Sequence, residues 1–438
     1  MFVSYSAPLP LWLLLVMTGA SAFSSAEALT FEASFSSEVT PFNINVSTTS
    51  IADTIDRVSR ARLPQELGIT PFEDGPPLHD AAIIKDYWVQ TYDWSRVQAS
   101  INKRLKQFTS VTPPTPDSPY QHDIPLHFIH HRSSRSDAIP LLVIHGWPGS
   151  FLEIENIIGS LTDPPSDDYP AFHVVAPSIP GFAFSPAPTH PGLGAIAAAH
   201  AFNNLMLKLG YPRYVVQAGD AGGIIMRYQA HFYPDNVVSG LSNFWVVQPN
   251  EDDLARYAAG ETSSDENYII RTLTNFLDKS WGYGQIQQTR PLKLAYAMTD
   301  SPLGLAMWIY DALYPSAWDP KIWTPEVVIT WTMMHWIQGP YAAFRWYKEE
   351  AADGAFSTKA FGDLPYVKVP MAITEYPKDL WYRTPLEWAQ RTGNVKKRYM
   401  HDKGGHFPAW ESPELLLGDI WDWFGNEEES GTAVFRKT

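Results

Sequence analysis

Residues 214–223 read Tyr-Val-Val-Gln-Ala-Gly-Asp-Ala-Gly-Gly, and this stretch decides the fold of the 438-residue chain. An apolar strand at 214–216 runs into a turn where small residues flank Asp220, and apolar residues 224–226 then predict a helix. Small neighbours tolerate a sharp, strained turn that exposes the central side chain, as in a nucleophile elbow. Taken alone, the pattern also fits an ordinary aspartate at a helix N-cap.

Short apolar strands alternate with helical segments around this turn. Strands of this kind imply an α/β fold, with a mostly parallel sheet covered by helices on both faces. Between about residues 244 and 346, helical stretches rich in Trp and Tyr interrupt the strands, which predicts a helical insertion. The predicted strands are residues 141–144, 173–176, 214–216, 237–241, 367–373 and 397–400.

The region before the sheet, residues 41–108, is aromatic-rich and predicted to be mostly helical. Ile51, Ile55 and Val58 keep helical spacing before Pro64, and a second helix begins at about Asp80. Four prolines within residues 112–119 predict a surface linker.

Composition excludes several classes of function. The net charge of -15 disfavours binding to nucleic acid or to an anionic membrane surface. The absence of cysteine excludes thiol catalysis, disulfides and Cys-based metal sites. His130 and His131 would point to opposite faces of a strand, so we expect no metal site there and no metal or other cofactor.

The N-terminus resembles a secretory signal. Residues 1–26 carry no charge, residues 11–17 are apolar, and Ala20-Ser21-Ala22 has the form of a signal-peptidase site. We therefore expect a signal peptide at residues 1–22 and a protein that is secreted or in the lumen of the endoplasmic reticulum. The lack of Lys and Arg before the apolar run leaves a membrane anchor as the alternative. On the secretory route, Asn45 in Asn45-Val46-Ser47 becomes a glycosylation site.

Two further segments supply chemistry that would complement Asp220. His145-Gly146-Trp147-Pro148-Gly149 follows a predicted strand, where α/β-hydrolases place their oxyanion loop, so backbone N–H groups of Trp147 and Ala221 would converge on one oxygen. His406 follows two glycines after a later strand, and Asp379 follows another. The chain order of nucleophile, acid and histidine matches the α/β-hydrolases. Because no Gly-x-Ser-x-Gly occurs, a serine esterase is disfavoured.

The sequence resembles the microsomal epoxide hydrolases over almost its whole length after the signal segment. The matching segments are Tyr92-Asp93-Trp94, residues 145–150 (HGWPGS), 177–182 (PSIPGF), 282–287 (GYGQIQ), 300–306 (DSPLGLA), 345–348 (RWYK) and 404–407 (GGHF).

This resemblance implies the roles of the site residues. Asp220 would be the nucleophile, His406 the general base and Asp379 the acid that orients it, with Glu375 as the other candidate for that acid. Tyr283 and Tyr347 would bind the epoxide oxygen from the lid.

The resemblance also implies the reactants and the domain organisation. A lipophilic epoxide and water would react without a cofactor. For the oligomeric state, a homodimer is one open alternative. The expected parts are the signal peptide or anchor (1–22), an N-terminal meander and linker (23–120), an α/β-hydrolase core (121–243 and 349–438) and a helical lid (244–348).

Three other functions compete with this hypothesis. A dehalogenase also uses an aspartate nucleophile, but it would bind halide with Trp or Asn N–H donors in place of two phenols. An epoxide-opening cyclase would use a substrate hydroxyl instead of water. A non-catalytic lipophile-binding protein would not need the complete set of Asp220, His406 and Asp379.

Overall fold

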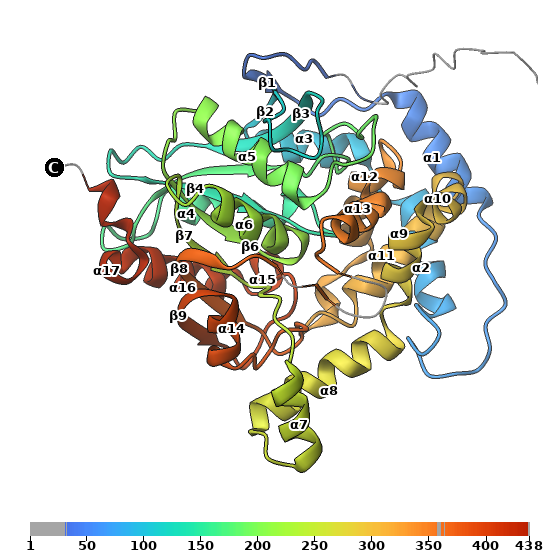
Figure 1. Ribbon diagram of the computed structural model, residues 1–438. Helices are drawn as coiled ribbons and strands as arrows, with labels where there is room; N and C mark the ends of the chain where they lie inside the picture. Colours follow the sequence, from blue (N-terminus) through green and yellow to red (C-terminus); the bar gives the residue numbers. More distant parts are fainter. Residues whose placement is uncertain (1–30, 32, 357–360, 363, 437–438) are drawn as a thin grey trace, which may run out of the picture.

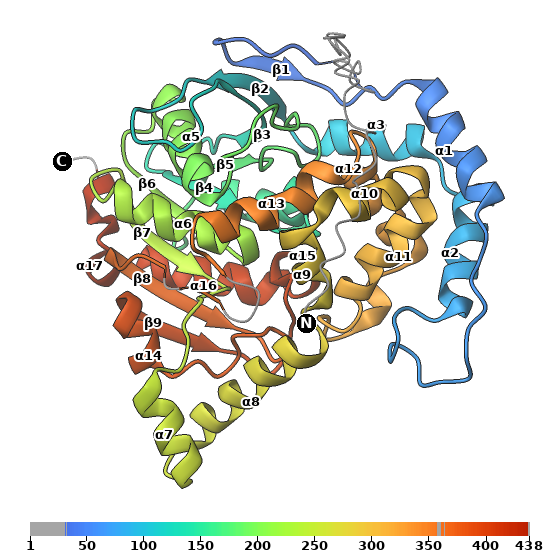
Figure 2. The same ribbon diagram turned by 45° about the vertical axis from the view of Figure 1, so that its right-hand side comes forward.

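A nine-stranded sheet forms the centre of the computed structural model, which describes residues 31, 33–356, 361, 362 and 364–436. Figures 1 and 2 show this sheet crossing the molecule, with helices on both sides. Its strand order is β1-β2-β3-β5-β4-β6-β7-β8-β9. The strands are β1 (Thr40–Phe42), β2 (Gln107–Thr112), β3 (Ile124–His131), β4 (Ile139–Ile144), β5 (Phe172–Pro177), β6 (Tyr214–Ala218), β7 (Val237–Ser242), β8 (Val367–Glu375) and β9 (Gly393–Met400).

The parallel part of the sheet confirms the predicted α/β fold. All six predicted strands are present, and β5, β4, β6, β7, β8 and β9 pair in parallel. The neighbours β4 and β6 end in register, with Ile144 opposite Ala218. The loops that follow these two strands therefore leave the same edge of the sheet side by side.

The antiparallel strands β1, β2 and β3 extend the sheet beyond the prediction. Residues 41–108 were expected to be mostly helical, and three helices between β1 and β2 confirm this, but the two strands at the ends of the range were not predicted. The sequence of β2, Gln-Phe-Thr-Ser-Val-Thr, has no apolar run that predicts a buried strand. It is stabilised by contacts from elsewhere in the chain, because the Thr109 hydroxyl donates to Ser34 O at 2.7 Å.

Helices α6 (Asp220–Phe232) and α16 (Pro413–Gly425) cover opposite faces of the sheet. Adjacent residues of β7 face opposite ways. A side chain at Gly240 would meet Met226 of α6, whereas Ser239 accepts a hydrogen bond from Trp423 of α16 at 3.0 Å. Other helices of the core are α4 (Ile158–Thr162), α5 (Ala195–Lys208), α14 (Leu386–Thr392), α15 (Pro408–Glu411) and α17 (Glu427–Ser430).

The predicted helical insertion is present between β7 and β8, and it forms a lid. Its helices are α7 (Glu251–Ala259), α8 (Ser264–Lys279), α9 (Gly282–Thr289), α10 (Pro291–Asp300), α11 (Pro302–Leu313), α12 (Pro325–Trp336) and α13 (Tyr341–Ala352). Figure 2 shows α10, α11, α12 and α13 grouped beside the core, while α7 and α8 extend away from it.

The N-terminal helices α1 (Thr48–Arg60), α2 (Leu78–Gln90) and α3 (Trp94–Arg104) lie along the outer side of the lid (Figure 2). Polar contacts join the two parts. Arg57 pairs with Asp300 at 2.6 Å, Arg96 pairs with Glu326 at 2.7 Å, and Trp336 Nε1 donates to the Thr54 hydroxyl at 2.8 Å.

The expected signal segment, residues 1–22, lies outside the described residues, and Asn45 of the sequon is exposed. Within the ranges that the structure describes, we find no helix with the length and apolar character needed to cross a membrane.

Replacing Gly222 by alanine is expected to push apart the loops that follow β4 and β6 at the edge of the sheet. The added Cβ would lie 2.2 Å from Ile144 O, a backbone atom that cannot move aside. Overpacking of this kind costs about 1–3 kcal/mol, so thermal or denaturant unfolding should report a clear loss of stability.

The matched control is Gly418→Ala on α16, where nothing lies within 4 Å of the added carbon. This change should stabilise the helix by about 0.5–1 kcal/mol. If Gly222→Ala left the free energy of unfolding unchanged, the close approach of the two loops would not be a constraint on the fold.

Candidate active site

Asp220 occupies a sharp turn between β6 and α6. Its φ of 49° lies in the left-handed region, which non-glycine residues adopt rarely and at an energetic cost. The flanking residues must be small, because a Cβ on Gly219 would lie 2.3 Å from Asn243 Nδ2 and one on Gly222 would lie 2.2 Å from Ile144 O. The turn therefore has the geometry predicted from the sequence.

The loop after β4, residues 145–149, was predicted to be the oxyanion loop, and it lies directly against Asp220. The backbone N–H of Trp147 donates to Asp220 Oδ1 at 2.8 Å. A Cβ on Gly146 would come within 2.3 Å of Asp220 Cβ, so only glycine allows this approach. Ala221, the other expected N–H donor, follows Asp220 and lines the same cavity.

His406 bridges two carboxylates. Its Nδ1 is 2.6 Å from Asp379 Oδ2, and its Nε2 is 3.5 Å from Asp220 Oδ2. Burial acts to lower the pKa of His406, but hydrogen bonds to the carboxylates of Asp220 and Asp379 outweigh it and hold that pKa well above its usual range. Asp379 is itself held by the Trp381 N–H at 2.9 Å.

Glu375, the other candidate for the acid, points elsewhere. It pairs with Arg398 at 3.0 Å and accepts a hydrogen bond from Arg383 N at 2.8 Å. The structure therefore brings Asp379, and not Glu375, against His406.

The two lid tyrosines meet above Trp147. Tyr283 begins α9 and Tyr347 lies on α13, and their ring centroids are 6.0 Å apart. The Trp147 ring stacks on Tyr283 at 5.3 Å and meets the edge of Tyr347 at 5.7 Å. Their hydroxyl groups are hydrogen-bonded to each other. Burial, followed by nearby charges that include Asp220, raises the pKa of both phenols, so both are protonated at neutral pH.

A cavity of about 960 Å³ joins the tyrosines, Asp220 and His406. Its walls come from the core, the lid and the N-terminal segment, and they are rich in aromatic side chains. The aromatic residues of the wall are Phe72, Trp147, Phe244, Tyr268, Phe276, Trp281, Tyr283, Trp308, Tyr347, Phe356, Phe361 and Phe407.

Two acids near Asp220 were missed by the sequence analysis. Glu350 lines the cavity one helical turn after Tyr347, and Glu153 follows the oxyanion loop. Burial, followed by smaller effects that include the charge of Asp220, raises the pKa of Glu350 well above its usual range and that of Glu153 to about 8. Glu153 lies four residues after Gly149, and its nearness to that loop was the only signal available. Nothing in the pattern of α13 distinguishes Glu350 from its neighbour Glu349.

No group of three or more metal-ligating side chains occurs among the residues that the structure describes. His130 and His131 end β3 on opposite faces, and each has a partner. His130 Nε2 lies 3.0 Å from the Tyr211 hydroxyl, and His131 Nε2 accepts from Lys106 N at 2.8 Å.

The sheet, the strained turn, the oxyanion loop and the histidine–aspartate pair define an α/β-hydrolase with a carboxylate at the position of the nucleophile. Comparison with known families agrees. Residues 39–154 match the model described as epoxide hydrolase N terminus, and residues 139–242 match the alpha/beta hydrolase fold.

Whole-length relatives identify the family. A putative epoxide hydrolase of Stigmatella aurantiaca is 32% identical, over 88% of this chain and 84% of its own. Epoxide hydrolase 1 of Sus scrofa is 30% identical, over 89% of each chain. The chain therefore belongs to the epoxide hydrolases of microsomal type, enzymes that act on an ether bond with an epoxide and water as reactants.

Solved structures give the same fold. Juvenile hormone epoxide hydrolase of the silkworm Bombyx mori superposes with a TM-score of 0.77 at 26% identity, covering 88% of this chain and 94% of that one. The Aspergillus niger epoxide hydrolase superposes with a TM-score of 0.75 at 24% identity, covering 90% and 97%.

Asp379→Asn should lower the pKa of His406, because it removes one of the two carboxylates that stabilise the imidazolium. Glu375→Gln is the control, since Glu375 pairs with arginine and makes no contact with His406. NMR titration of isotope-labelled histidine can follow both variants. A larger fall in the Glu375 variant than in the Asp379 variant would reverse the assignment of the acid.

Proposed function

We propose that the enzyme opens a lipophilic epoxide to a vicinal diol through an ester between the substrate and Asp220. The observation that carries this proposal is the arrangement of two protonated phenols and one carboxylate around a single aromatic cavity. An epoxide needs an acid at its oxygen and a nucleophile at its carbon, and this arrangement offers both.

In the first half-reaction, a carboxylate oxygen of Asp220 attacks an epoxide carbon while the ring C–O bond breaks. The alkoxide that forms takes a proton from Tyr283 or Tyr347. The tyrosinate regains a proton from the His406 imidazolium, whose pKa falls once Asp220 is esterified, and this leaves a neutral His406 as the base. A phenol suits this role because it stays protonated at neutral pH yet stabilises the developing negative charge. Two phenols from different helices also fix the ring for in-line attack.

In the second half-reaction, water attacks Cγ of the ester. His406 Nε2 takes the proton of that water, and Asp379 stabilises the imidazolium. The oxyanion is held by the Trp147 N–H, which already donates to this carboxyl group, and by that of Ala221. When the ester C–O bond breaks, the hydroxyl proton of the tetrahedral intermediate passes to the departing diol oxygen and the Asp220 carboxylate is restored. His406 keeps the proton that it took from water and returns to its resting imidazolium form.

The walls of the cavity favour a lipophilic substrate, because burial of apolar surface against aromatic rings provides most of the binding free energy. The paired phenols favour an epoxide over an organic halide, since halide needs N–H donors and has no use for two hydroxyl groups. The complete Asp220–His406–Asp379 set argues against a non-catalytic binding protein and against a cyclase that bypasses ester hydrolysis.

A single turnover in heavy-oxygen water tests the ester. Styrene-type, terpene and fatty-acid epoxides would first be screened for diol formation. In the first turnover of an accepted epoxide, the diol should carry ordinary oxygen and the peptide containing Asp220 should gain the label. His406→Gln should retain ester formation and accumulate the adduct in intact-protein mass spectra. A labelled diol in the first turnover would mean direct attack by water.

Tyr283→Phe and Tyr347→Phe should each slow alkylation by roughly 10- to 1,000-fold, because the remaining phenol compensates for part of the roughly 100- to 1,000-fold effect of losing an oxyanion donor. Each change removes one hydroxyl but keeps the ring that packs on Trp147. The double variant should be near background, while ester hydrolysis should change far less. Stopped-flow Trp fluorescence can separate the two steps. If both single variants alkylated at the wild-type rate, the two hydroxyl groups would have no role at the epoxide oxygen, and the tyrosines would only pack in the lid.

A further inference from the structure

Glu153 has no part in the mechanism above, yet it contacts the oxyanion loop at both ends. It lies in the short helix η1 (Phe151–Asn156) that follows the loop. The N–H of Gly146 donates to Glu153 Oε1 at 3.5 Å, and a Cβ on Gly149 would lie 1.7 Å from the same oxygen. The carboxyl group therefore fills the space inside the loop, next to the amide of Trp147 that holds Asp220.

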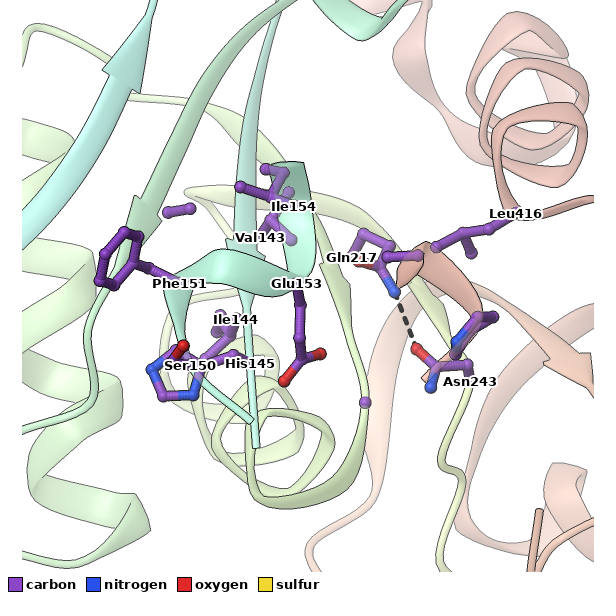
Figure 3. Close-up of a pocket in the computed structure, with 14 residues that line it drawn as sticks. Val143, Ile144, His145, Ser150, Phe151, Glu153, Ile154, Gln217, Asn243 and Leu416 are labelled. Carbon is purple, nitrogen blue, oxygen red and sulfur yellow. Dashed lines mark hydrogen bonds between the residues drawn. The ribbon is translucent and has the colours of Figure 1, made fainter. Parts of the chain in front are cut away.

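A small cavity opens beside this carboxyl group (Figure 3). Of its lining residues, only Glu153 and Gly219 keep appreciable accessible surface, so it is enclosed within the protein. The cavity touches three parts of the site: His145 begins the oxyanion loop, Gly219 precedes Asp220, and Pro408 follows His406 by two residues.

The cavity has the size and the polarity to hold one water. Its space of about 20 Å³ exceeds the roughly 10–15 Å³ that one water needs. Figure 3 shows the Glu153 carboxyl group on one side and the hydrogen-bonded pair of Gln217 and Asn243 on the other. Gln217 Nε2 donates to Asn243 Oδ1 at 2.9 Å, which leaves the Asn243 amide nitrogen as a donor.

A water between Glu153 and Asn243 would connect the two loops that form the site. The side chain of Asn243 packs directly on Gly219, since a Cβ there would lie 2.3 Å from Asn243 Nδ2. Glu153 contacts the loop that carries the Trp147 N–H. The hydrogen bonds of such a water would therefore fix the position of the oxyanion donor relative to Asp220.

The charge of Glu153 also depends on the state of Asp220. The pKa of Glu153 is raised to about 8: burial is the largest cause, His406 and the Gly146 N–H oppose it, and the charge of Asp220 adds a smaller increase. Esterification removes the charge of Asp220, so the pKa of Glu153 falls and its ionised form becomes more favourable. The ionised form stabilises the imidazolium of His406, which forms again when neutral His406 takes a proton from water in ester hydrolysis.

We propose that this cavity binds one water, and that Glu153 is a positioning residue for the hydrolytic half-reaction, acting through that water and the Gly146 N–H. The inference rests on the proposed ester intermediate. The rate of alkylation should depend on Glu153 only through the conformation of the oxyanion loop.

Glu153→Gln and Glu153→Leu test this role, with Glu155→Gln as the matched control. Glu155 lies on the same short helix but pairs with Arg104. Rapid quench and mass spectrometry, with styrene oxide as the probe, would give the rates of alkylation and hydrolysis separately. Loss of a direct oxyanion donor costs roughly 100- to 1,000-fold. For the indirect role of Glu153 we expect hydrolysis to slow about tenfold in the Gln variant and more in the Leu variant.

Alkylation should stay within about twofold of the wild-type rate, and the control should match the wild type in both steps. Unchanged hydrolysis in both Glu153 variants would overturn the role of Glu153. Equal slowing of both steps with a lower melting temperature would also overturn it, in favour of a purely structural contact.

A crystal structure of the wild-type enzyme should contain an ordered water within hydrogen-bonding distance of Glu153, and a dry cavity would overturn the water site. A wild-type enzyme that forms no ester at Asp220 with any accepted epoxide would contradict the proposed function itself. That result is independent of what the Glu153 variants do.

Discussion

The close approach of the loops that follow β4 and β6 is the constraint on which the rest of the site depends. Two glycines permit it, because a Cβ at Gly146 would lie 2.3 Å from Asp220 Cβ and one at Gly222 would lie 2.2 Å from Ile144 O. This approach puts the Trp147 N–H on Asp220 and gives Asp220 its strained backbone. The parallel register of β4 and β6 makes it possible, since both strands end at the same level.

The site also concentrates carboxyl groups. Asp220 and Asp379 lie against His406. Burial raises the pKa of Glu350 well above its usual range and that of Glu153 to about 8, so these two are mostly protonated at neutral pH. Such a cluster keeps His406 protonated in the resting enzyme and discourages ionisation of the tyrosines. In the proposed mechanism, esterification of Asp220 would remove one negative charge, so the same groups would favour different protonation states in the two half-reactions. One set of side chains can thereby serve first an acid-assisted step and then a base-assisted step.

The sequence predicts the central elements of this fold because their signals are local. The turn around Asp220 requires small neighbours, and the buried parallel strands are continuous apolar runs, so both can be read along the chain. The strand β2 could not be read in this way, because its Thr and Ser side chains are bonded by segments distant in sequence. Asp379 and Glu375 are only four residues apart in sequence. Asp379 contacts His406 and Glu375 contacts Arg398, and this difference is determined by the tertiary structure.

The tyrosines illustrate the same limit. Neither Tyr283 nor Tyr347 stands out among 21 tyrosines, and only the family resemblance indicates them. Glu350 carries no signal at all, because its position depends on how α13 faces the cavity. Local conformation is thus predictable here, while the partners of a side chain become known only when the lid is placed on the core.

The N-terminal helices fasten the lid from outside, through Arg57 with Asp300, Arg96 with Glu326 and Trp336 with Thr54. A lid attached on two sides cannot swing open as one piece without breaking these contacts. We therefore expect substrates to enter and diols to leave by rearrangement of side chains at the cavity mouth, which includes Phe72 and residues 73–75 of the N-terminal segment. The N-terminal segment, which lines the cavity but supplies none of the reacting groups, would then control substrate entry and diol release, and with them the rate at which each catalytic cycle can restart.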